Sequence, residues 1–206
     1  MVYPIRIIGV GPGHEDYITP AAKKAAETAD LLVGSQRSLK HFLYLKKEIF
    51  IIGRDMPGLV RKIKEFQTNK RVAVLVTGDP GFYSLASYLK KHFSRAQLEL
   101  MPGISSTQVA FARIGRSWEN VQFISVHGRP LNKLLPVIEN YGTVAVLTDN
   151  LNTPKVVADY LKGKIEGDPL VFICDSLTDP AEEIFETRLS QVYQDTKNSV
   201  MVIAYE

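Results

Sequence analysis

Short apolar runs rich in β-branched residues alternate along the chain with longer segments that have helical periodicity. The clearest apolar runs span residues 5–10, 71–76 and 98–101, and a helix-like segment follows each of them. Short β-branched runs bounded by glycine are typical of buried strands. Because strands that alternate with helices favour a mostly parallel sheet covered on both faces, the pattern predicts an α/β fold.

Helix ends are marked by two similar dipeptides. Thr19-Pro20 and Thr153-Pro154 each supply a hydroxyl for the N-cap and a proline for the first helical position. They predict helices that begin beside each proline, the first over residues 21–29. The remaining helices are predicted over residues 83–93, 105–113 and 131–140.

Each of the three apolar runs ends in a loop rich in glycine and proline. The loops read Gly9-Val10-Gly11-Pro12-Gly13, Thr77-Gly78-Asp79-Pro80-Gly81-Phe82-Tyr83 and Met101-Pro102-Gly103-Ile104-Ser105-Ser106. Ligands of open α/β sheets settle outside the carboxyl ends of the strands. The three loops therefore predict one ligand site, and we interpret the chain as an enzyme.

Two nucleotide-binding motifs compete with this interpretation and both fail. Gly9-x-Gly11 begins like a dinucleotide fingerprint, but His14 stands where the third glycine belongs. The second strand ends in Gly34-Ser35 rather than in the acidic residue that would bind a ribose. No glycine-rich loop ends in Gly-Lys-Ser or Gly-Lys-Thr, so a P-loop is not indicated either.

The second half of the chain carries strands with fewer helices between them. The predicted strands span residues 121–126, 143–147, 170–174, 183–188 and 200–204. This composition favours a mixed α/β domain. No proline-rich linker separates the halves, so Gly115-Arg116-Ser117 is the best hinge candidate and predicts domains at 1–117 and 118–206.

Composition narrows the class of protein. The chain has 206 residues and is 45% hydrophobic, but no apolar run reaches the roughly 20 residues of a membrane span, and the N-terminus has no secretion signal pattern. We expect a cytoplasmic protein without membrane contact. The net charge of +3 does not indicate nucleic-acid binding. Cys174 lies in an apolar run, where a structural thiol is favoured over a nucleophile.

Histidines and arginines are the remaining candidates for chemistry. The histidines lack the paired spacing of a metal site, so no protein-bound metal is expected; they are His14, His41, His92 and His127. Residues 113–133 hold four basic side chains against Glu119 alone. Two interpretations stay open for this segment, namely a solvated surface or a site for a substrate with several carboxylates.

Three motifs together resemble the tetrapyrrole methylases. They are Gly9-x-Gly11-Pro12-Gly13 with Tyr17-Ile18-Thr19, Gly78-Asp79-Pro80-x-x-Tyr83, and Pro102-Gly103-Ile104-Ser105-Ser106. The resemblance covers the whole chain and implies a two-domain α/β fold, with a trough for S-adenosylmethionine between a mostly parallel N-terminal sheet and a mixed C-terminal sheet. The segments 33–39, 125–130 and 147–154 resemble those members that methylate ring carbon 5 of cobalt-precorrin-7 in cobalamin biosynthesis.

The resemblance also implies site residues. Cofactor contacts are carried onto Gly78, Asp79, Tyr83, Ser105, Ser106, Thr148 and Asp149, with a less certain adenine contact at Ser199 and Val200. Pro12 and Gly13 are expected on the substrate side. We expect the substrate carboxylates to bind Arg37, Arg113, Arg116 and Arg129. An in-line methyl transfer from a sulfonium needs alignment more than a protein nucleophile or a metal.

Structural alternatives stay open for several of these residues. Asp79 could cap the following helix, Ser105 and Ser106 could cap theirs, and Tyr83 could belong to the core. His127 is a candidate base for the proton that leaves the methylated ring carbon, although a structural histidine or a water molecule would also fit.

Alternatives also stay open for the function. The chain could methylate another ring carbon, or carry a corrin without catalysis. Nothing follows Glu206 and no second glycine-rich methyltransferase motif exists, so the resemblance implies a stand-alone subunit. A companion chain would then methylate carbon 15 and remove a carboxyl group. The resemblance further implies a homodimer.

Overall fold

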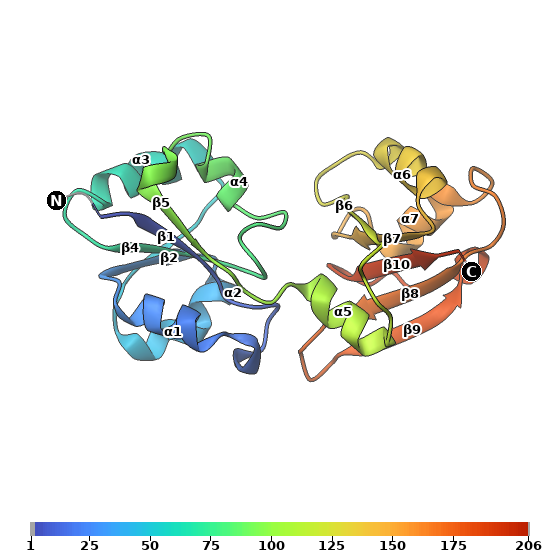
Figure 1. The fold of residues 1–206 in the computed structure, drawn as a ribbon, viewed down its shortest axis with the longest axis horizontal. Coiled ribbons are helices and arrows are strands. Elements are labelled where there is room, and N and C mark those ends of the chain that lie inside the picture. The colour runs from blue at the N-terminus through green and yellow to red at the C-terminus, as the bar shows by residue number, and fades with distance from the viewer. Residues whose placement is uncertain (1–2, 206) are drawn as a thin grey trace. The chain divides into compact units, whose positions relative to one another are not determined.

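The computed structural model describes residues 3–205, so Glu206, the last residue of the predicted C-terminal domain, lies outside the described residues. The chain forms two compact units, one up to Ser105 and one from Ser106 onward (Figure 1). This division lies earlier than the predicted boundary after residue 117, because the helix Ser106–Ile114 packs with the second sheet. The hinge at residues 115–117 stays a prediction.

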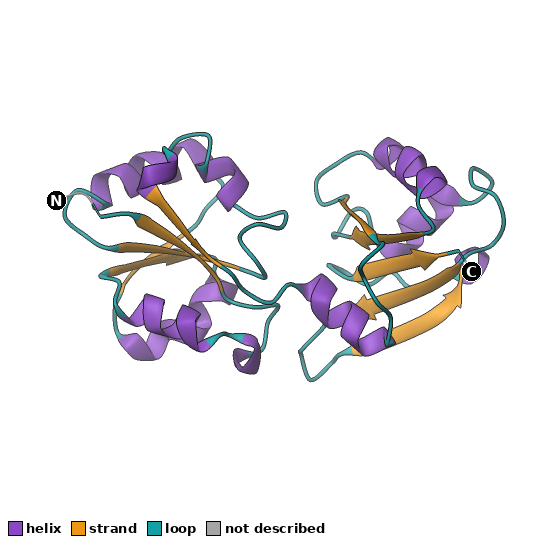
Figure 2. Ribbon diagram, viewed as in Figure 1, coloured by secondary structure: helices purple, strands orange, loops and turns teal. Residues whose placement is uncertain are grey.

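The first unit is a parallel sheet with helices on both faces (Figure 2). Its strands are β1 (Ile5–Gly9), β2 (Leu31–Gly34), β3 (Glu48–Ile51), β4 (Val72–Val76) and β5 (Leu98–Met101). Its α-helices are α1 (Pro20–Glu27), α2 (Gln36–Leu39), α3 (Met56–Phe66) and α4 (Ala86–Leu89), and its 3-10 turns are η1 (Glu15–Tyr17), η2 (Lys40–Leu45) and η3 (Arg95–Gln97).

The order of the strands in the first sheet places the three predicted loops side by side. The order is β3-β2-β4-β1-β5, and every neighbouring pair is parallel. The strands β4, β1 and β5 are therefore adjacent. Because they are parallel, the loops that follow them all leave the sheet at the carboxyl ends of the strands. This arrangement confirms the parallel sheet that the alternation of strands and helices predicts.

Alternate residues of each strand face two separate cores. On one face, Ile8 and Leu75 pack with α1, α2 and η2, as in the cluster that contains Ala22 and Phe42. On the other face, residues such as Ile7 pack with α3 and α4. The inner strands β1, β2 and β4 are buried on both sides, which explains why they read as nearly continuous apolar runs rather than as an alternating pattern.

Local signals in the first unit vary in how well they predict the elements. Thr19 caps α1 as expected, since its Oγ1 accepts a hydrogen bond from the Ala22 N–H at 3.1 Å. The edge strand β3 and the helix α3 were missed, although Asp55 caps α3 through the Gly58 N–H. At the amino ends of the strands, opposite the three loops, Asp30 pairs with Arg71 through both carboxylate oxygens.

The second unit contains a mixed sheet. Its strands are β6 (Gln122–Ser125), β7 (Thr143–Leu147), β8 (Leu170–Asp175), β9 (Glu183–Arg188) and β10 (Val200–Ala204). Its α-helices are α5 (Ser106–Ile114), α6 (Leu134–Asn140) and α7 (Pro154–Leu161), and its 3-10 turns are η4 (Leu131–Lys133) and η5 (Leu189–Gln191). The strand order is β6-β7-β10-β8-β9, with β6 and β7 parallel and the other pairs antiparallel. The predicted mixed α/β character is confirmed.

Helices cover both faces of the second sheet. The helices α6 and α7 pack on the face that carries Val146 and Ile173, and form the main core of this unit. The helix α5 lies on the other face, where the Phe111 ring meets the Phe123 ring of β6 edge to face. Thr153 caps α7 as predicted. In the described residues no helix is both long and apolar enough to cross a membrane.

Candidate functional site

The three loops of the first unit meet at a backbone contact between glycines. A Cβ atom added to Gly103 would lie 2.4 Å from the Gly78 oxygen, and one added to Gly9 would lie 2.5 Å from the same oxygen. No side chain fits at such distances. Gly78 also has a φ of +70° and donates its N–H to the Gly11 oxygen at 2.8 Å. The strand ends thus converge so closely that Gly9 and Gly103 have no room for a Cβ atom, and glycine is required at both positions.

Asp79 joins two of these loops. Its Oδ1 accepts the Gly81 N–H at 2.7 Å, and its Oδ2 accepts the Gly103 N–H at 3.0 Å. The helix α4 begins only at Ala86, so the alternative that Asp79 caps this helix is wrong. The helix predicted over residues 83–93 is correspondingly shorter. The Asp79 carboxylate fixes the β4 loop against the β5 loop, and its role as a cofactor contact stays a prediction.

Tyr83 follows in a strained backbone conformation. Its φ is +46°, a region that residues with side chains rarely adopt, and its ring meets the Phe82 ring edge to face. Tyr83 is 44% exposed, so the alternative that it belongs to the core is wrong. Strain of this kind persists where the surrounding structure imposes it and is common at binding sites. The predicted cofactor contact is compatible with this placement.

The first loop is held by residues of the segment that follows β2. The Arg37 Nη2 donates to the Pro12 oxygen at 3.0 Å, so two predicted substrate-side residues lie together. His41, to which the sequence assigned no role, forms a hydrogen bond with the backbone of Gly13. Burial, together with the Lys40 charge, lowers the pKa of His41, which favours a neutral imidazole near Gly13.

The two serines predicted to contact the cofactor lie where the third loop meets α5. Ser105 is buried, and α5 begins at Ser106. Gly78 lies close to Ser105, since a Cβ added to Gly78 would be 3.7 Å from the Ser105 Cα. Gly78, Asp79 and Ser105 are therefore neighbours in the first unit, as one binding site requires.

In the second unit, Thr148 is tied to Ser199 across the end of β7. The Thr148 Oγ1 donates to the Ser199 oxygen at 2.8 Å and accepts the Ser199 N–H at 2.9 Å. Ser199 in turn donates its Oγ to the Asp175 Oδ1 at 2.7 Å. Thr148, Ser199 and Asp175 thus form one polar row at an end of the sheet, in which Thr148 and Ser199 are buried and Asp175 is partly buried. Asp175 was missed by the sequence analysis, although its place at the end of a strand is a usable signal.

Asp149 gathers backbone N–H groups from two loops. Its Oδ1 accepts from Leu151 at 2.8 Å and from Asn152 at 2.6 Å, while its Oδ2 accepts from Gly128 at 2.6 Å. Burial opposes the charge of Asp149, but these three hydrogen bonds outweigh it and lower the pKa of the carboxyl group. An ionised, buried Asp149 therefore joins the loop after β7 to the turn after β6.

His127 lies on that turn, at the surface of the second unit. The Asn152 Nδ2 donates to the Val126 oxygen at 2.8 Å and to the Arg129 oxygen at 3.1 Å, which fixes the turn on both sides of the histidine. His127 is exposed, and its side chain can meet a ligand in solution. Its candidate role as a base stays a prediction.

The arginines of the second unit are engaged by other residues of this unit. Arg113 forms an ion pair with Glu182, the guanidinium of Arg116 lies 4.9 Å from the centre of the Phe172 ring, and Arg129 donates to the Ser125 oxygen at 3.3 Å. The pair with Glu182 bears on the predicted excess of positive charge in residues 113–133, because Glu182 neutralises part of it. Substrate binding by these arginines stays a prediction.

Burial makes Cys174 unreactive. The thiol is buried at the end of β8, and this burial, with a contribution from the Glu182 charge, raises its pKa to about 12. A protonated thiol is a poor nucleophile. No group of three or more histidine, cysteine or acidic side chains among residues 3–205 is placed to hold a metal ion.

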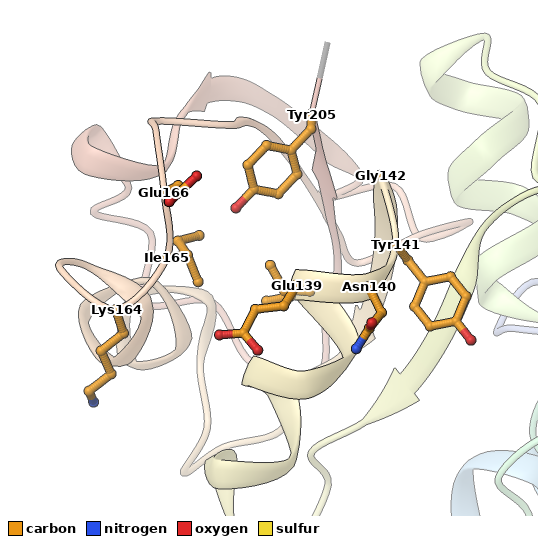
Figure 3. A pocket seen from close by; sticks show the side chains of 9 residues that line it. Glu139, Asn140, Tyr141, Gly142, Lys164, Ile165, Glu166 and Tyr205 are labelled. Atoms are coloured by element: carbon orange, nitrogen blue, oxygen red, sulfur yellow. The ribbon is translucent and has the colours of Figure 1, made fainter.

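A hollow of about 670 Å³ lies at the end of the second sheet that is opposite Thr148 and Ser199 (Figure 3). Glu139, Glu166 and Tyr205 surround it, and burial with the Glu166 charge raises the pKa of Tyr205. The hollow lies where β7 begins and β10 ends, whereas Thr148 and Ser199 lie at the other ends of these strands. None of the predicted site residues lines it, so we do not assign the methyl-transfer chemistry to it.

Comparisons with known proteins agree on one family. The sequence profile described as Tetrapyrrole (Corrin/Porphyrin) Methylases matches residues 4–193. A Methanocaldococcus jannaschii protein named probable cobalt-precorrin-7 C(5)-methyltransferase is 34% identical, covering 98% of this chain and 97% of its own length. The Salmonella typhimurium cobalt-precorrin-7 C(5)-methyltransferase is 32% identical, covering 98% of this chain and 99% of its own length.

A solved structure shares the fold. The crystal structure of a precorrin-6Y methylase from Archaeoglobus fulgidus aligns with a TM-score of 0.76 over 100% of both chains, at 23% sequence identity. At this identity the likeness speaks for the fold alone, and it agrees with the parallel and mixed sheets described above.

Because of the glycine contact, we expect that adding one methyl group at Gly103 lowers the stability of the protein. In Gly103→Ala the new Cβ would meet the Gly78 and Gly9 oxygens at 2.4 and 2.7 Å. We expect the free energy of unfolding to fall by about 1–3 kcal/mol, the usual cost of overpacking. Urea denaturation measures it. Gly53→Ala is the control, since a Cβ there meets nothing within 4 Å, and equal stability of the two variants would contradict the contact.

Asp149 predicts a pH-dependent contribution to stability. Because its pKa is lowered in the folded state, the stabilisation is complete above the unfolded value of about 4 and is lost as the pH falls through the folded value. Asp149→Asn is expected to lower the free energy of unfolding by about 2 kcal/mol at pH 7. The difference from the wild type should narrow below about pH 4 in urea titrations.

The control for this prediction is Asp16→Asn, whose side chain is 80% exposed. We expect it to change stability by less than about 0.5 kcal/mol at either pH. A difference between Asp149→Asn and the wild type that stays constant from pH 7 to pH 3 would show that the carboxylate charge does not hold the two loops together.

Proposed function

Because this chain belongs to the tetrapyrrole methylase family, we propose that it transfers a methyl group from S-adenosylmethionine to ring carbon 5 of cobalt-precorrin-7 in cobalamin biosynthesis. The product would be cobalt-precorrin-8. The observation that carries this proposal is the match, over almost the full length of both chains, to two relatives named for this reaction. The glycine contact of the first unit supports it, because the loops around that contact hold most of the predicted donor-binding residues.

The proposed reaction needs few chemical groups from the protein. The electron pair of the ring carbon forms a bond to the methyl carbon, while the bond from methyl to sulfur breaks and its electron pair stays on sulfur as S-adenosylhomocysteine leaves. The carbon then loses its proton. A sulfonium is a strong methyl donor, so the protein contributes chiefly by aligning donor and acceptor.

Rigid backbone elements supply this alignment. In the first unit, Gly78 and Asp79 are fixed by backbone hydrogen bonds, and Gly78 brings main-chain groups within reach of a ligand without a side chain in the way. In the second unit, Thr148 and Asp149 are fixed in the same manner. We propose that these residues, with Tyr83, Ser105 and Ser106, contact the methyl donor.

Substrate binding and proton removal are assigned to other residues. We propose that Pro12 and Gly13 face the corrin and that its carboxylates meet Arg37, Arg113, Arg116 and Arg129. His127 is the candidate that accepts the proton, because it lies exposed on a turn held by Asn152. A His127→Gln variant should lower the single-turnover rate constant by about 100-fold if the imidazole acts as a base, and an unchanged rate constant would exclude that role.

The family resemblance further implies a homodimer in the cytoplasm and a separate subunit for the step at carbon 15. These remain proposals beside the main one. Sedimentation equilibrium of the purified chain tests the dimer, and a monomer at micromolar concentration would reject it. Co-purification with a decarboxylating methyltransferase tests the second subunit.

Donor binding is the first test of the proposed function. We expect calorimetry to show binding of S-adenosylhomocysteine in the micromolar range and no binding of NAD. Gly78→Val should weaken binding by at least about tenfold, or 1.4 kcal/mol, because a valine at a φ of +70° distorts the loop. The matched control is Gly163→Val, which has the same strain at a φ of +71° but lies beyond α7, with nothing within 4 Å of its Cβ.

Turnover distinguishes the proposed reaction from the alternatives. With ¹³C-methyl S-adenosylmethionine and cobalt-precorrin-7, the product should carry the label at carbon 5. A label at another carbon would assign a different ring position. A protein that binds both ligands and transfers no methyl group would be a corrin carrier, and a folded protein that binds no S-adenosylhomocysteine would not be a methylase.

A further inference from the structure

The loop that joins β8 to β9 lies at the same end of the strands of the second sheet as Thr148 and Asp149. In the register of the sheet, Leu147 lies opposite Val200, which lies opposite Cys174. The residues one step beyond this row, at the ends of the strands, include Thr148 and Asp175, and the loop of residues 176–182 follows from there. This loop carried no predicted site residue. It nevertheless contacts one, because it holds Glu182, the ion-pair partner of Arg113 on α5.

Glu182 uses both of its carboxylate oxygens inside the second unit. Its Oε2 accepts the Thr178 N–H at 2.6 Å, and its Oε1 accepts the Arg113 Nε–H. The Glu182 side chain is only 19% exposed, whereas the carboxylate side chains of Glu99 and Glu65 in other ion pairs are 47% and 63% exposed. The Arg113 guanidinium, helped by the Thr178 N–H, holds the pKa of Glu182 below its ordinary value against the effect of burial.

The backbone that presents Glu182 is strained. Ser176 and Thr178 have φ values of +48° and +68°, and for a β-branched threonine this conformation is rare. Two turns close the loop, since the Asp179 N–H donates to the Ser176 oxygen and the Glu182 N–H donates to the Asp179 oxygen, both at 2.9 Å. Such strain costs on the order of 1–3 kcal/mol and persists only where the surroundings impose it. The ion pair with Arg113 is one such constraint.

The pair fixes the orientation of a cation that the proposed reaction needs. An arginine side chain loses considerable rotamer entropy when it binds a ligand, and a partner that holds it beforehand removes part of that cost. A guanidinium has five N–H donors in a rigid plane, so a bond through Nε to Glu182 does not prevent it from meeting a second carboxylate. The partly buried Glu182 thereby orients the Arg113 side chain.

We propose that Glu182 is a positioning residue that orients Arg113 for a carboxylate of the corrin substrate. This inference rests on the proposed function and extends it to a residue that neither the motifs nor the charge pattern identified. It assigns to Glu182 an effect on substrate affinity that passes through Arg113. No effect on the methyl donor is expected.

The test is a double-mutant cycle on substrate affinity. Glu182→Gln keeps the shape of the side chain and removes its charge, so the KM for cobalt-precorrin-7 should rise about tenfold, which corresponds to 1.4 kcal/mol, with kcat changed less than about twofold. The affinity for S-adenosylhomocysteine should stay constant. In an Arg113→Ala background, Glu182→Gln should have no further effect on KM, since its influence requires the arginine.

A matched control separates this role from a general loss of structure. Asp30→Asn breaks the pair between Asp30 and Arg71, whose atoms approach to 2.6 Å, at the edge of the first sheet opposite the three loops. It should lower stability without changing KM. Additive effects of Glu182→Gln and Arg113→Ala, an unchanged KM in Glu182→Gln, or a parallel loss of donor affinity would each overturn the proposal.

Direct binding distinguishes a failure of this proposal from a failure of the proposed function. Cobalt-precorrin-7 absorbs visible light, so its dissociation constant is measurable by absorbance titration with S-adenosylhomocysteine present. If the wild type binds the corrin but does not methylate it, the proposed function fails while the cycle, run on dissociation constants, still decides the role of Glu182. If the wild type does not bind the corrin, both are rejected.

Discussion

The contact of three glycine backbones, at Gly9, Gly78 and Gly103, is the constraint on which the first unit depends. Because a single Cβ at two of these positions would lie within 2.5 Å of the Gly78 oxygen, the ends of β1, β4 and β5 can converge only without side chains. The parallel order β4-β1-β5 brings them to one edge. Asp79 then fixes the β5 loop through the Gly103 N–H. What results is a set of loops held rigidly together at the carboxyl ends of the strands, which is what an alignment mechanism requires.

In the second unit, a carboxylate rather than a contact between glycines holds the loops at the strand ends together. Asp149 accepts three backbone N–H groups and so joins the loop after β7 to the turn that carries His127. Thr148 and Ser199 lock the neighbouring strand ends together. Residues predicted to touch a cofactor are thus also those that shape the loops. The two roles are compatible, since a carboxylate that accepts three backbone N–H groups holds its loop in one conformation and does not prevent this loop from meeting a ligand.

A count of charges does not describe the arginines of the second unit, because specific partners engage their side chains. Residues 113–133 carry an excess of +3 in the sequence, yet Arg113 pairs with Glu182, which lies 69 residues away. Arg116 lies over the Phe172 ring, where a cation is attracted by the π electrons. These partners turn flexible side chains into oriented ones.

The sequence by itself determined most of the strands, the two Thr-Pro helix starts, the three glycine-rich loops and the family, because these depend on local periodicity and on short motifs. It did not determine the start of α4, since Tyr83 enters the left-handed region instead of a helix, nor the edge strand β3, whose exposed isoleucines lack an alternating pattern. Only the tertiary structure decided that Asp79 bonds Gly103 rather than a helix end, and that Glu182 holds Arg113. Such partners are distant in the chain, and no local pattern encodes a contact that exists only after the strands have taken their order.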